Sequence, residues 1–359
     1  MLTRLSKSLL QAIRPRWLFQ AQRKAPGVRR GSVTHVIILD GTMSSLKPGE
    51  ESNAGLIYKL MSEHSGTDLS VYYEAGIQWR NWKNTHDVMM GRGINRQIRR
   101  AYGYLASRYR PGDRIFLFGY SRGAYAVRSL AGILDRVGLL KAEEATERNV
   151  QLAYRHYEAG GHSSAARAFA RARCHEHAVV EMIGAFDTVK SLGLRLPLLW
   201  QFTEPRHAFH NHALSRCVKA GFHALAVEER RAVYSPVMWH SDPDWSGRLE
   251  QVWFAGTHGD VGGQLGGEWK SRPLSNLPLV WMLEKAEACD LPMPQGWRAQ
   301  FPTDPNAPSI GMWKGWSKLF LIREKRQLGL DPSERLHESA VARGLEFPAI
   351  APQTAQAGV

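Results

Sequence analysis

A short apolar run leads directly into a Gly-x-Ser-x-Gly motif, and this junction restricts the fold of the 359-residue chain more than any other feature. Residues 115–118 (Ile-Phe-Leu-Phe) are typical of a strand buried on both faces, and residues 124–137 have the pattern of a helix. Ser121 would stand in the sharp turn between them, where Gly119 and Gly123 remove Cβ atoms that would collide with neighbouring backbone. This context predicts a nucleophile elbow; the alternative is a tight turn whose glycines serve packing only.

The rest of the chain alternates between strand and helix patterns. Further buried strands are expected at 35–39, 69–74, 179–186 and 251–254, and helices at 54–64, 94–109 and 277–289. This alternation predicts an α/β fold of the α/β-hydrolase type, a mostly parallel sheet with helices on both faces and a ligand site at the carboxyl ends of its strands. Two long segments, 143–173 and 208–233, are predicted to be helical insertions, one of which would roof an apolar cleft.

Composition and charge divide the chain into an expected α/β domain at 32–291 and two flanking parts. Residues 292–359 begin Pro-rich and irregular, include an aromatic and basic patch at 313–320, and are expected to pack on the domain as an extension. Residues 1–31 hold eight Lys and Arg residues and no acidic residue. This arm therefore supplies more than half of the net charge of +14 of the whole chain. This arm is either an amphipathic segment that contacts an anionic membrane or a disordered basic tail.

The composition also limits the class of protein. Hydrophobic residues make up 43% and charged residues 22%, as in a folded globular chain, and no apolar run is long enough to span a membrane or to form a secretory signal. Three scattered cysteines without a C-x-x-C pair indicate a reducing compartment. We therefore expect a cytoplasmic protein that is peripheral to a membrane if the arm binds lipid. The positive charge lies mostly on the arm and no readout motif occurs, so no nucleic-acid partner is expected.

A serine nucleophile needs a base and an acid, and two later strands end in candidates for these roles. Asp187 follows the strand at 179–186 and His258 follows the strand at 251–254, which gives the order Ser, Asp, His that α/β-hydrolases use. Asp260 is an alternative acid, although it could instead fix the His258 loop by accepting backbone N–H bonds. The non-catalytic alternatives are that Asp187 caps a helix and that His258 is a structural residue of its loop.

An oxyanion hole needs two donors, and the predicted ones are the backbone N–H of Arg122 and a group from the turn after the strand at 35–39. In that turn Gly41 lets the main chain approach the substrate, and Thr42 adds a hydroxyl donor. The alternative is an ordinary strand-to-helix turn. Four further residues are expected to support the site: Asp40, Gly119, Gly123 and Asp260.

Two rival functions are weaker. His207, His210 and His212 lie close together and residues 174–177 read Cys-His-Glu-His, but neither cluster has zinc-site spacing, so no metal and no cofactor are expected. The other rival is a non-enzymatic hydrolase-like protein that binds lipid or a protein partner at a membrane surface.

Several motifs together resemble an uncharacterised α/β-hydrolase family that includes the catalytic domain of type VI secretion phospholipase effectors. They are Asp40-Gly-Thr42, Gly91-Arg-Gly93, residues 111–125 around the elbow, Phe186-Asp-Thr-Val189, residues 223–231 (His-Ala-Leu-Ala-Val-Glu-Glu-Arg-Arg) and His258-Gly-Asp-Val-Gly-Gly263. The resemblance runs from about His35 to Ala288, and His337-Glu-Ser339 resembles the family's closing segment. After Asp-Gly-Thr the family commonly has an Asn, whereas this chain reads Met43-Ser-Ser45.

The resemblance implies a lipid esterase with Ser121, Asp187 and His258 as its triad, and it leaves His337 as an outside candidate for the base. The sequence therefore predicts a serine hydrolase that cleaves a carboxylic ester, in particular a lipid or phospholipid acyl ester, through an acyl-enzyme and without a cofactor.

Overall fold

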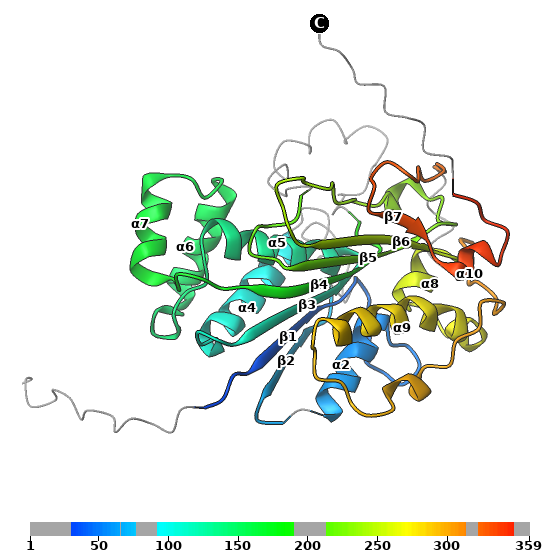
Figure 1. Cartoon of the computed structure of the whole chain (residues 1–359), viewed down its shortest axis with the longest axis horizontal. Coiled ribbons are helices and arrows are strands. Elements are labelled where there is room, and N and C mark those ends of the chain that lie inside the picture. Colours follow the sequence, from blue (N-terminus) through cyan, green and yellow to red (C-terminus); the bar gives the residue numbers. More distant parts are fainter. Residues whose placement is uncertain (1–29, 65, 77–91, 190–212, 314–321, 348–359) are drawn as a thin grey trace, which may run out of the picture. The chain divides into compact units, whose positions relative to one another are not determined.

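A sheet of seven strands forms the centre of the computed structural model, which describes residues 30–64, 66–76, 92–189, 213–313 and 322–347 (Figure 1). Every pair of neighbouring strands in this described part is parallel, and the strand order is β2-β1-β3-β4-β5-β6-β7. The chain divides at residue 31 into two units, and the sheet belongs to the unit that begins at Ser32. The strands are β1 (Thr34–Leu39), β2 (Leu69–Glu74), β3 (Arg114–Tyr120), β4 (Val180–Phe186), β5 (Ala220–Ala226), β6 (Arg248–Phe254) and β7 (Glu334–Leu336).

Helices cover both faces of the sheet. Alternate residues of each central strand point to opposite sides, and because both sets are apolar, both faces are buried under helices. In β1, Ile37 and Leu39 pack with the helices of one face, whereas Val36 and Ile38 pack with those of the other. Figure 1 shows α4 and α5 on one side of the sheet and α2 and α9 on the other. The predicted α/β-hydrolase-like parallel sheet with helices on both faces is confirmed. The principal helices are α2 (Asn53–Glu63), α4 (Arg92–Arg108), α5 (Arg122–Arg136), α6 (Glu147–Glu158), α7 (Ser164–Arg173), α8 (His258–Gly262) and α9 (Arg272–Ala288).

The first expected insertion, 143–173, consists of a 3₁₀ turn, η3 (Ala142–Glu144), followed by α6 and α7. Thr146 and Ser163 cap the two α-helices, since each hydroxyl accepts a backbone N–H bond from the first turn. Helix α6 packs against α4 and α5, and in Figure 1 this pair lies at the opposite end of the molecule from α8. The insertion therefore flanks the sheet.

The second expected helical insertion, 208–233, is wrong over its described part. Residues 220–226 form the strand β5 between β4 and β6. In the described residues from 213 to 233, the only helical turn is the start of the short η6 (Ala232–Tyr234). The segment reads Ala-Gly-Phe-His-Ala-Leu-Ala, and its alanines suggest a helix by intrinsic propensity. All seven residues are buried, and burial in the middle of a parallel sheet overrides that propensity.

The C-terminal segment from 292 onward was expected to be irregular, and that expectation needs correction. It contains η8 (Trp297–Gln300), the edge strand β7 and a last helix α10 (Glu338–Val341). Strand β7 pairs with β6, so the sheet is completed by residues that lie far beyond 291. Most of the aromatic and basic patch at 313–320 lies outside the described residues.

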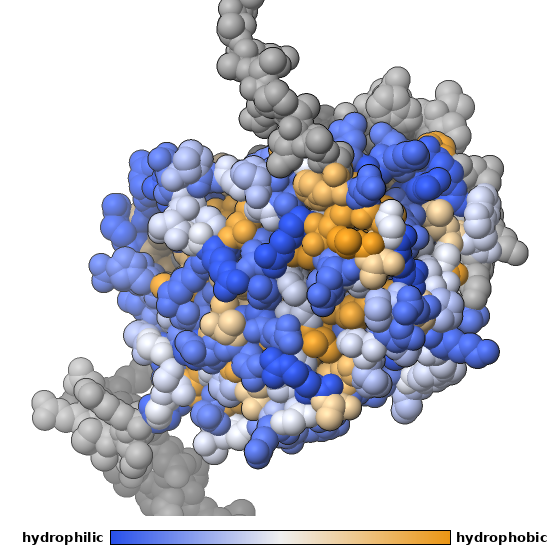
Figure 2. Space-filling model, turned by 45° about the vertical axis from the view of Figure 1, so that its right-hand side comes forward, coloured by the Kyte–Doolittle hydropathy of each residue, from blue (hydrophilic) through white to orange (hydrophobic). Residues whose placement is uncertain are grey.

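The surface of this unit is mainly hydrophilic on the face drawn in Figure 2, with apolar residues gathered in smaller patches. Large apolar side chains are exposed at scattered positions, as is ordinary for a folded protein. Within the described part of the chain, no helix combines the length and apolar character needed to cross a membrane. The exposed large apolar residues are Met43, Val179, Trp269, Trp313, Ile322, Leu330 and Val341.

Candidate active site

Ser121 lies between the end of β3 and the start of α5, as the elbow motif predicts. Its backbone has φ 57° and ψ −119°, a conformation that non-glycine residues rarely adopt and that is typical of strained functional turns. A Cβ atom on Gly123 would lie 2.0 Å from the carbonyl oxygen of Leu39, and one on Gly119 would lie 2.5 Å from the carbonyl oxygen of Gly123. Both glycines therefore permit the close packing of β3, α5 and β1 that presents the serine.

Three side chains that are far apart in the sequence form a continuous hydrogen-bonded chain. His258 Nε2 lies 3.0 Å from Ser121 Oγ, and His258 Nδ1 lies 2.5 Å from Asp187 Oδ2. All three residues are buried: Ser121 is 6%, His258 5% and Asp187 0% exposed. They follow β3, β6 and β4, and parallel strands present their carboxyl ends at the same edge of a sheet.

The rings of two tyrosines pack against the imidazole ring of His258. Tyr234 stacks on it with ring centroids 4.5 Å apart and planes at 18°, and Tyr120 lies 5.0 Å away at 33°. The Tyr120 hydroxyl also donates a 3.3 Å hydrogen bond to the backbone carbonyl of His258. The ring is thus fixed by packing as well as by hydrogen bonds. The sequence analysis assigned no role to either tyrosine.

The loop that carries His258 is fastened to the end of β5 by two consecutive glutamates. Glu228 accepts the Gly256 N–H at 2.5 Å, and Glu229 accepts the His258 N–H at 3.1 Å. Burial raises the pKa of Glu229, but its hydrogen bonds and ion pair with Arg231 outweigh burial, so the pKa lies below its usual range. Both glutamates belong to the motif at 223–231, which the resemblance singled out without assigning any function to them.

Arg326 is a site residue that the sequence analysis missed. Its guanidinium donates to both carboxylate oxygens of Asp187, at 2.6 Å to Oδ1 and 2.9 Å to Oδ2. Burial by itself raises the pKa of Asp187, but Arg326 and then His258 overcome this effect and hold the pKa well below its usual range. No motif marks Arg326, because it stands in a stretch without helix or strand periodicity.

Asp260 lies close in sequence to His258 but serves the loop instead of the imidazole. Its Oδ2 accepts bonds from Thr257 N and Oγ1, both at 2.8 Å, and from Ser309 Oγ at 2.6 Å. Its Oδ1 accepts the Ile310 N–H at 3.0 Å. These four bonds match the supporting role that the sequence allowed for Asp260, and the carboxylate that contacts the His258 ring is that of Asp187.

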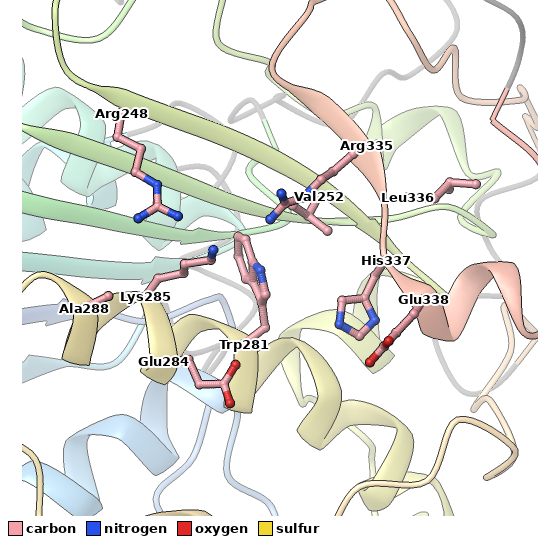
Figure 3. Close-up of a pocket in the computed structure, with 10 residues that line it drawn as sticks. All are labelled: Arg248, Val252, Trp281, Glu284, Lys285, Ala288, Arg335, Leu336, His337 and Glu338. Atoms are coloured by element: carbon pink, nitrogen blue, oxygen red, sulfur yellow. The ribbon is translucent and has the colours of Figure 1, made fainter.

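His337, the outside candidate for the base, belongs to a different place in the molecule. Its ring stacks on Phe254 with centroids 4.3 Å apart, and its Nδ1 lies 2.9 Å from Ser339 Oγ at the start of α10. Figure 3 shows it among the residues of a pocket of about 330 Å³ between α9, β6 and β7, opposite Trp281. Ser121 is not among the residues that line this pocket.

The turn after β1 is organised by the buried carboxylate of Asp40. Ser52 Oγ donates to it at 2.6 Å and Tyr73 Oη at 2.8 Å, while burial raises its pKa despite these bonds. The Gly41 N–H also donates to Asp40, at 2.7 Å. At the position where the family commonly has Asn, the turn continues with Met43 at φ 62° and with Ser44, whose hydroxyl donates to the Gly41 carbonyl at 2.7 Å.

The predicted oxyanion donors are the N–H of Arg122 and a group of the turn at 40–42. In that turn the Gly41 N–H donates to Asp40, and a Cβ atom on Gly41 would lie 2.7 Å from Tyr120 Cδ1. Within the described part of the chain, the N–H groups of Thr42 and Arg122 have no acceptor, and the Thr42 hydroxyl is buried without a partner. The backbone N–H of Arg122 is an orphan donor because it begins α5.

The suspected metal ligands do not form a site in the described residues. His207, His210 and His212 lie outside them. In the Cys-His-Glu-His stretch, Cys174 is buried, whereas His177 and Glu176 are exposed and pair only with each other at 3.8 Å. Across the described residues, no group of three or more His, Cys, Asp or Glu side chains could hold a metal ion.

Comparison with protein families matches residues 34–285 to the family described as "T6SS, Phospholipase effector Tle1-like, catalytic domain". The chain belongs to this family. The match covers the sheet from β1 to β6 and all three residues of the hydrogen-bonded chain, but it ends before Arg326. The family is described by the catalytic domain of phospholipase effectors.

Individual relatives are distant and longer than this chain. An uncharacterized protein of Saccharomyces cerevisiae is 26% identical over an alignment of 234 residues, and the alignment covers 58% of this chain and 33% of the relative. A crystal structure of an uncharacterized Pseudomonas aeruginosa protein has a TM-score of 0.44 and 15% identity, over 76% of this chain and 49% of that one. A Tle1 effector bound to the VgrG spike of the type 6 secretion system has a TM-score of 0.28 and 17% identity, over 65% and 51%. The chain thus spans about a third to a half of these proteins.

Proposed function

We propose that this protein is a serine hydrolase that cleaves an acyl ester of a lipid, in particular a phospholipid, through an acyl-enzyme. The observation that carries the proposal is the hydrogen-bonded chain from Ser121 through His258 to Asp187, buried at the carboxyl edge of the sheet. Serine, base and orienting acid in this order are what activation of a hydroxyl requires. The phospholipase name of the family supports the lipid substrate.

In the proposed reaction Ser121 Oγ attacks the ester carbonyl while His258 Nε2 takes its proton. Asp187 accepts the Nδ1–H bond, which keeps Nε2 free as the acceptor and stabilises the imidazolium that forms. The N–H groups of Thr42 and Arg122, which have no acceptor among the described residues, stabilise the oxyanion. The imidazolium then protonates the leaving alcohol, and a water molecule activated by the same imidazole releases the acid.

The partner of this site is the lipid substrate itself. We further propose that residues 1–31 attach the domain to anionic membranes, since their Lys and Arg side chains would each add about 1 kcal/mol at such a surface. Binding to vesicles with and without phosphatidylserine, by the full chain and by a chain that starts at residue 32, tests this attachment. Equal binding by both chains would contradict it.

The triad proposal is tested by Ser121→Ala. We expect turnover of a short-chain phosphatidylcholine and of a p-nitrophenyl ester to fall by about 10³-fold or more, because the residual rate comes from the oxyanion donors and binding alone. A fluorophosphonate should label the wild-type chain at Ser121 and leave this variant unlabelled. Circular dichroism and the melting temperature should show that the variant is folded.

A matched pair of histidine variants provides the control. His258→Gln should lose activity about as severely as Ser121→Ala, whereas His337→Gln, in the separate pocket, should keep it within a few-fold. An unlabelled wild-type chain without esterase activity would favour the non-enzymatic lipid-binding alternative. Full activity in Ser121→Ala would exclude this serine as the nucleophile.

A further inference from the structure

The buried guanidinium of Arg326 is held by four acceptors around the hydrogen-bonded chain. Besides the two oxygens of Asp187, it donates to the backbone carbonyls of Ala226 at 2.7 Å and Tyr234 at 2.5 Å. The side chain is 4% exposed. Backbone bonds fasten the same segment to the loop after β5, from Glu324 N to Arg230 O at 2.7 Å and from Ala232 N to Ile322 O at 3.1 Å. Arg326 is therefore built into the site, although it lies beyond the family match.

One carboxylate oxygen is shared between the arginine and the histidine. Asp187 Oδ2 contacts both His258 Nδ1, at 2.5 Å, and Arg326 Nη2, at 2.9 Å. In a Ser-His-Asp triad the charge of the acid serves to stabilise the imidazolium. Here a permanent cation neutralises much of that charge in a dry environment, where electrostatic interactions are strong.

The other charged and titratable groups around the pair do not replace this effect. Glu229, which accepts the His258 N–H, is neutralised by Arg231, and burial raises the pKa of Tyr234 and of Tyr120, so both stay uncharged. Behind Asp187, burial lowers the pKa of His223 to about 3, so this histidine is neutral as well. The remaining charged groups with an electrostatic effect on these neighbours are Arg122, Arg128 and Asp40.

We propose that Arg326 is a positioning residue of the catalytic site, which locks the carboxylate of Asp187 in the orientation that accepts the Nδ1 bond of His258. The inference rests on the proposed function, because it concerns the same proton relay. It also assigns the C-terminal segment a part in catalysis, since this segment brings the arginine to the site.

The test compares Arg326→Met and Arg326→Lys with the wild-type full chain. The rate of fluorophosphonate labelling at Ser121, kcat and KM for a soluble p-nitrophenyl ester, and the melting temperature are measured, and kcat is expressed per labelled serine. Arg326→Met should lose roughly 100-fold in kcat and in labelling rate, because small displacements in an active site have effects of that size. Its KM should stay within a few-fold of the wild-type value, because the side chain of Arg326 contacts the carboxylate of Asp187.

The lysine variant separates charge from geometry. Arg326→Lys keeps the positive charge and loses the planar fork, so its kcat should lie between the values of Arg326→Met and the wild type. A merely structural role would lower the melting temperature and the amount of labelled protein in Arg326→Met while kcat per labelled serine stayed at the wild-type value, and that result would overturn the inference. If Arg326→Met does not fold, the lysine variant decides: a wild-type kcat per labelled serine overturns the inference.

The labelling experiment also distinguishes a failure of this inference from a failure of the proposed function. Absence of wild-type labelling at Ser121 would mean that the serine hydrolase proposal fails and the inference with it. Labelling of the wild type at Ser121 combined with a wild-type kcat per labelled serine in Arg326→Met would mean that only the role of Arg326 fails.

Discussion

Among single residues, His223 shows how a buried side chain sets the position of Asp187. It lies in β5, is fully buried, and accepts the N–H of Thr188 at Nε2 over 3.0 Å. Its Nδ1 lies 3.4 Å from Gln251 Oε1. This pattern requires a neutral ring, consistent with the lowering of its pKa from 6.5 to about 3 by burial. The residue that follows Asp187 is therefore held by a histidine that stays unprotonated.

His223 makes folding sensitive to acid. The unfolded chain protonates it below its ordinary pKa, whereas the folded chain does not until about pH 3, so the stability due to its burial is complete above pH 6.5 and decreases as the pH falls from there. Between pH 7 and pH 5 the free energy of unfolding should fall by about 2 kcal/mol more in the wild type than in His223→Gln, which cannot take up a proton. Urea unfolding at both pH values measures this, and an equal fall in both proteins would contradict it.

At the level of elements, the site depends on how closely β1, β3 and α5 approach one another. The imaginary Cβ of Gly123 lies 2.0 Å from Leu39 O and 2.6 Å from Asp40 O, and both obstacles are backbone atoms that cannot rotate away. By contrast, a Cβ atom on Gly103, in the interior of α4, meets only Val150 Cγ2 at 3.6 Å, an ordinary contact. The two helical glycines therefore have different physical roles.

The two positions should respond in opposite directions to alanine. Gly123→Ala should destabilise the protein by more than about 3 kcal/mol and abolish labelling at Ser121, because the strand and the helix must separate. Gly103→Ala should raise stability by roughly 0.5–1 kcal/mol, because alanine is the better helix former, and should leave activity unchanged. Melting temperatures of the two variants check this, and a folded, active Gly123→Ala protein would show that the predicted clash is relieved.

Across the whole molecule, the segment beyond 291 belongs to the catalytic unit. Glu334 begins β7, and its buried carboxylate accepts the N–H groups of Gly329, Leu330 and Asp331 at 2.8–3.0 Å. It also accepts Trp253 Nε1 of β6 at 2.8 Å. One side chain thus joins the turn after the Arg326 segment to the sheet.

Loss of that carboxylate should loosen the C-terminal segment. Glu334→Ala leaves four donors without this acceptor, of which the Asp331 N–H and Trp253 Nε1 are buried. We expect a loss of about 2 kcal/mol or more in the free energy of unfolding. Glu338→Ala, at an exposed position four residues later, should change it by less than about 0.5 kcal/mol. Urea unfolding of the two variants is the measurement, and similar stabilities would show that the segment contributes little to the fold.

The sequence by itself determined the alternating elements, the elbow and the order of the three site residues. These follow from local rules: apolar runs mark buried strands, a glycine-flanked serine marks a turn too tight for side chains, and parallel strands bring their carboxyl ends to one edge. Ser121, Asp187 and His258 each follow such a strand, so their proximity could be predicted without coordinates.

Only the tertiary structure decided what surrounds those residues. Strand β5 was mistaken for a helix because its alanines express a propensity that burial overrides. The sequence left open which group of the turn at 40–42 faces the oxyanion, and only the structure shows that the Gly41 N–H donates to the side chain of Asp40. Arg326 and Tyr234 reach the site through contacts between segments distant in sequence, and such contacts leave no periodic signal along the chain.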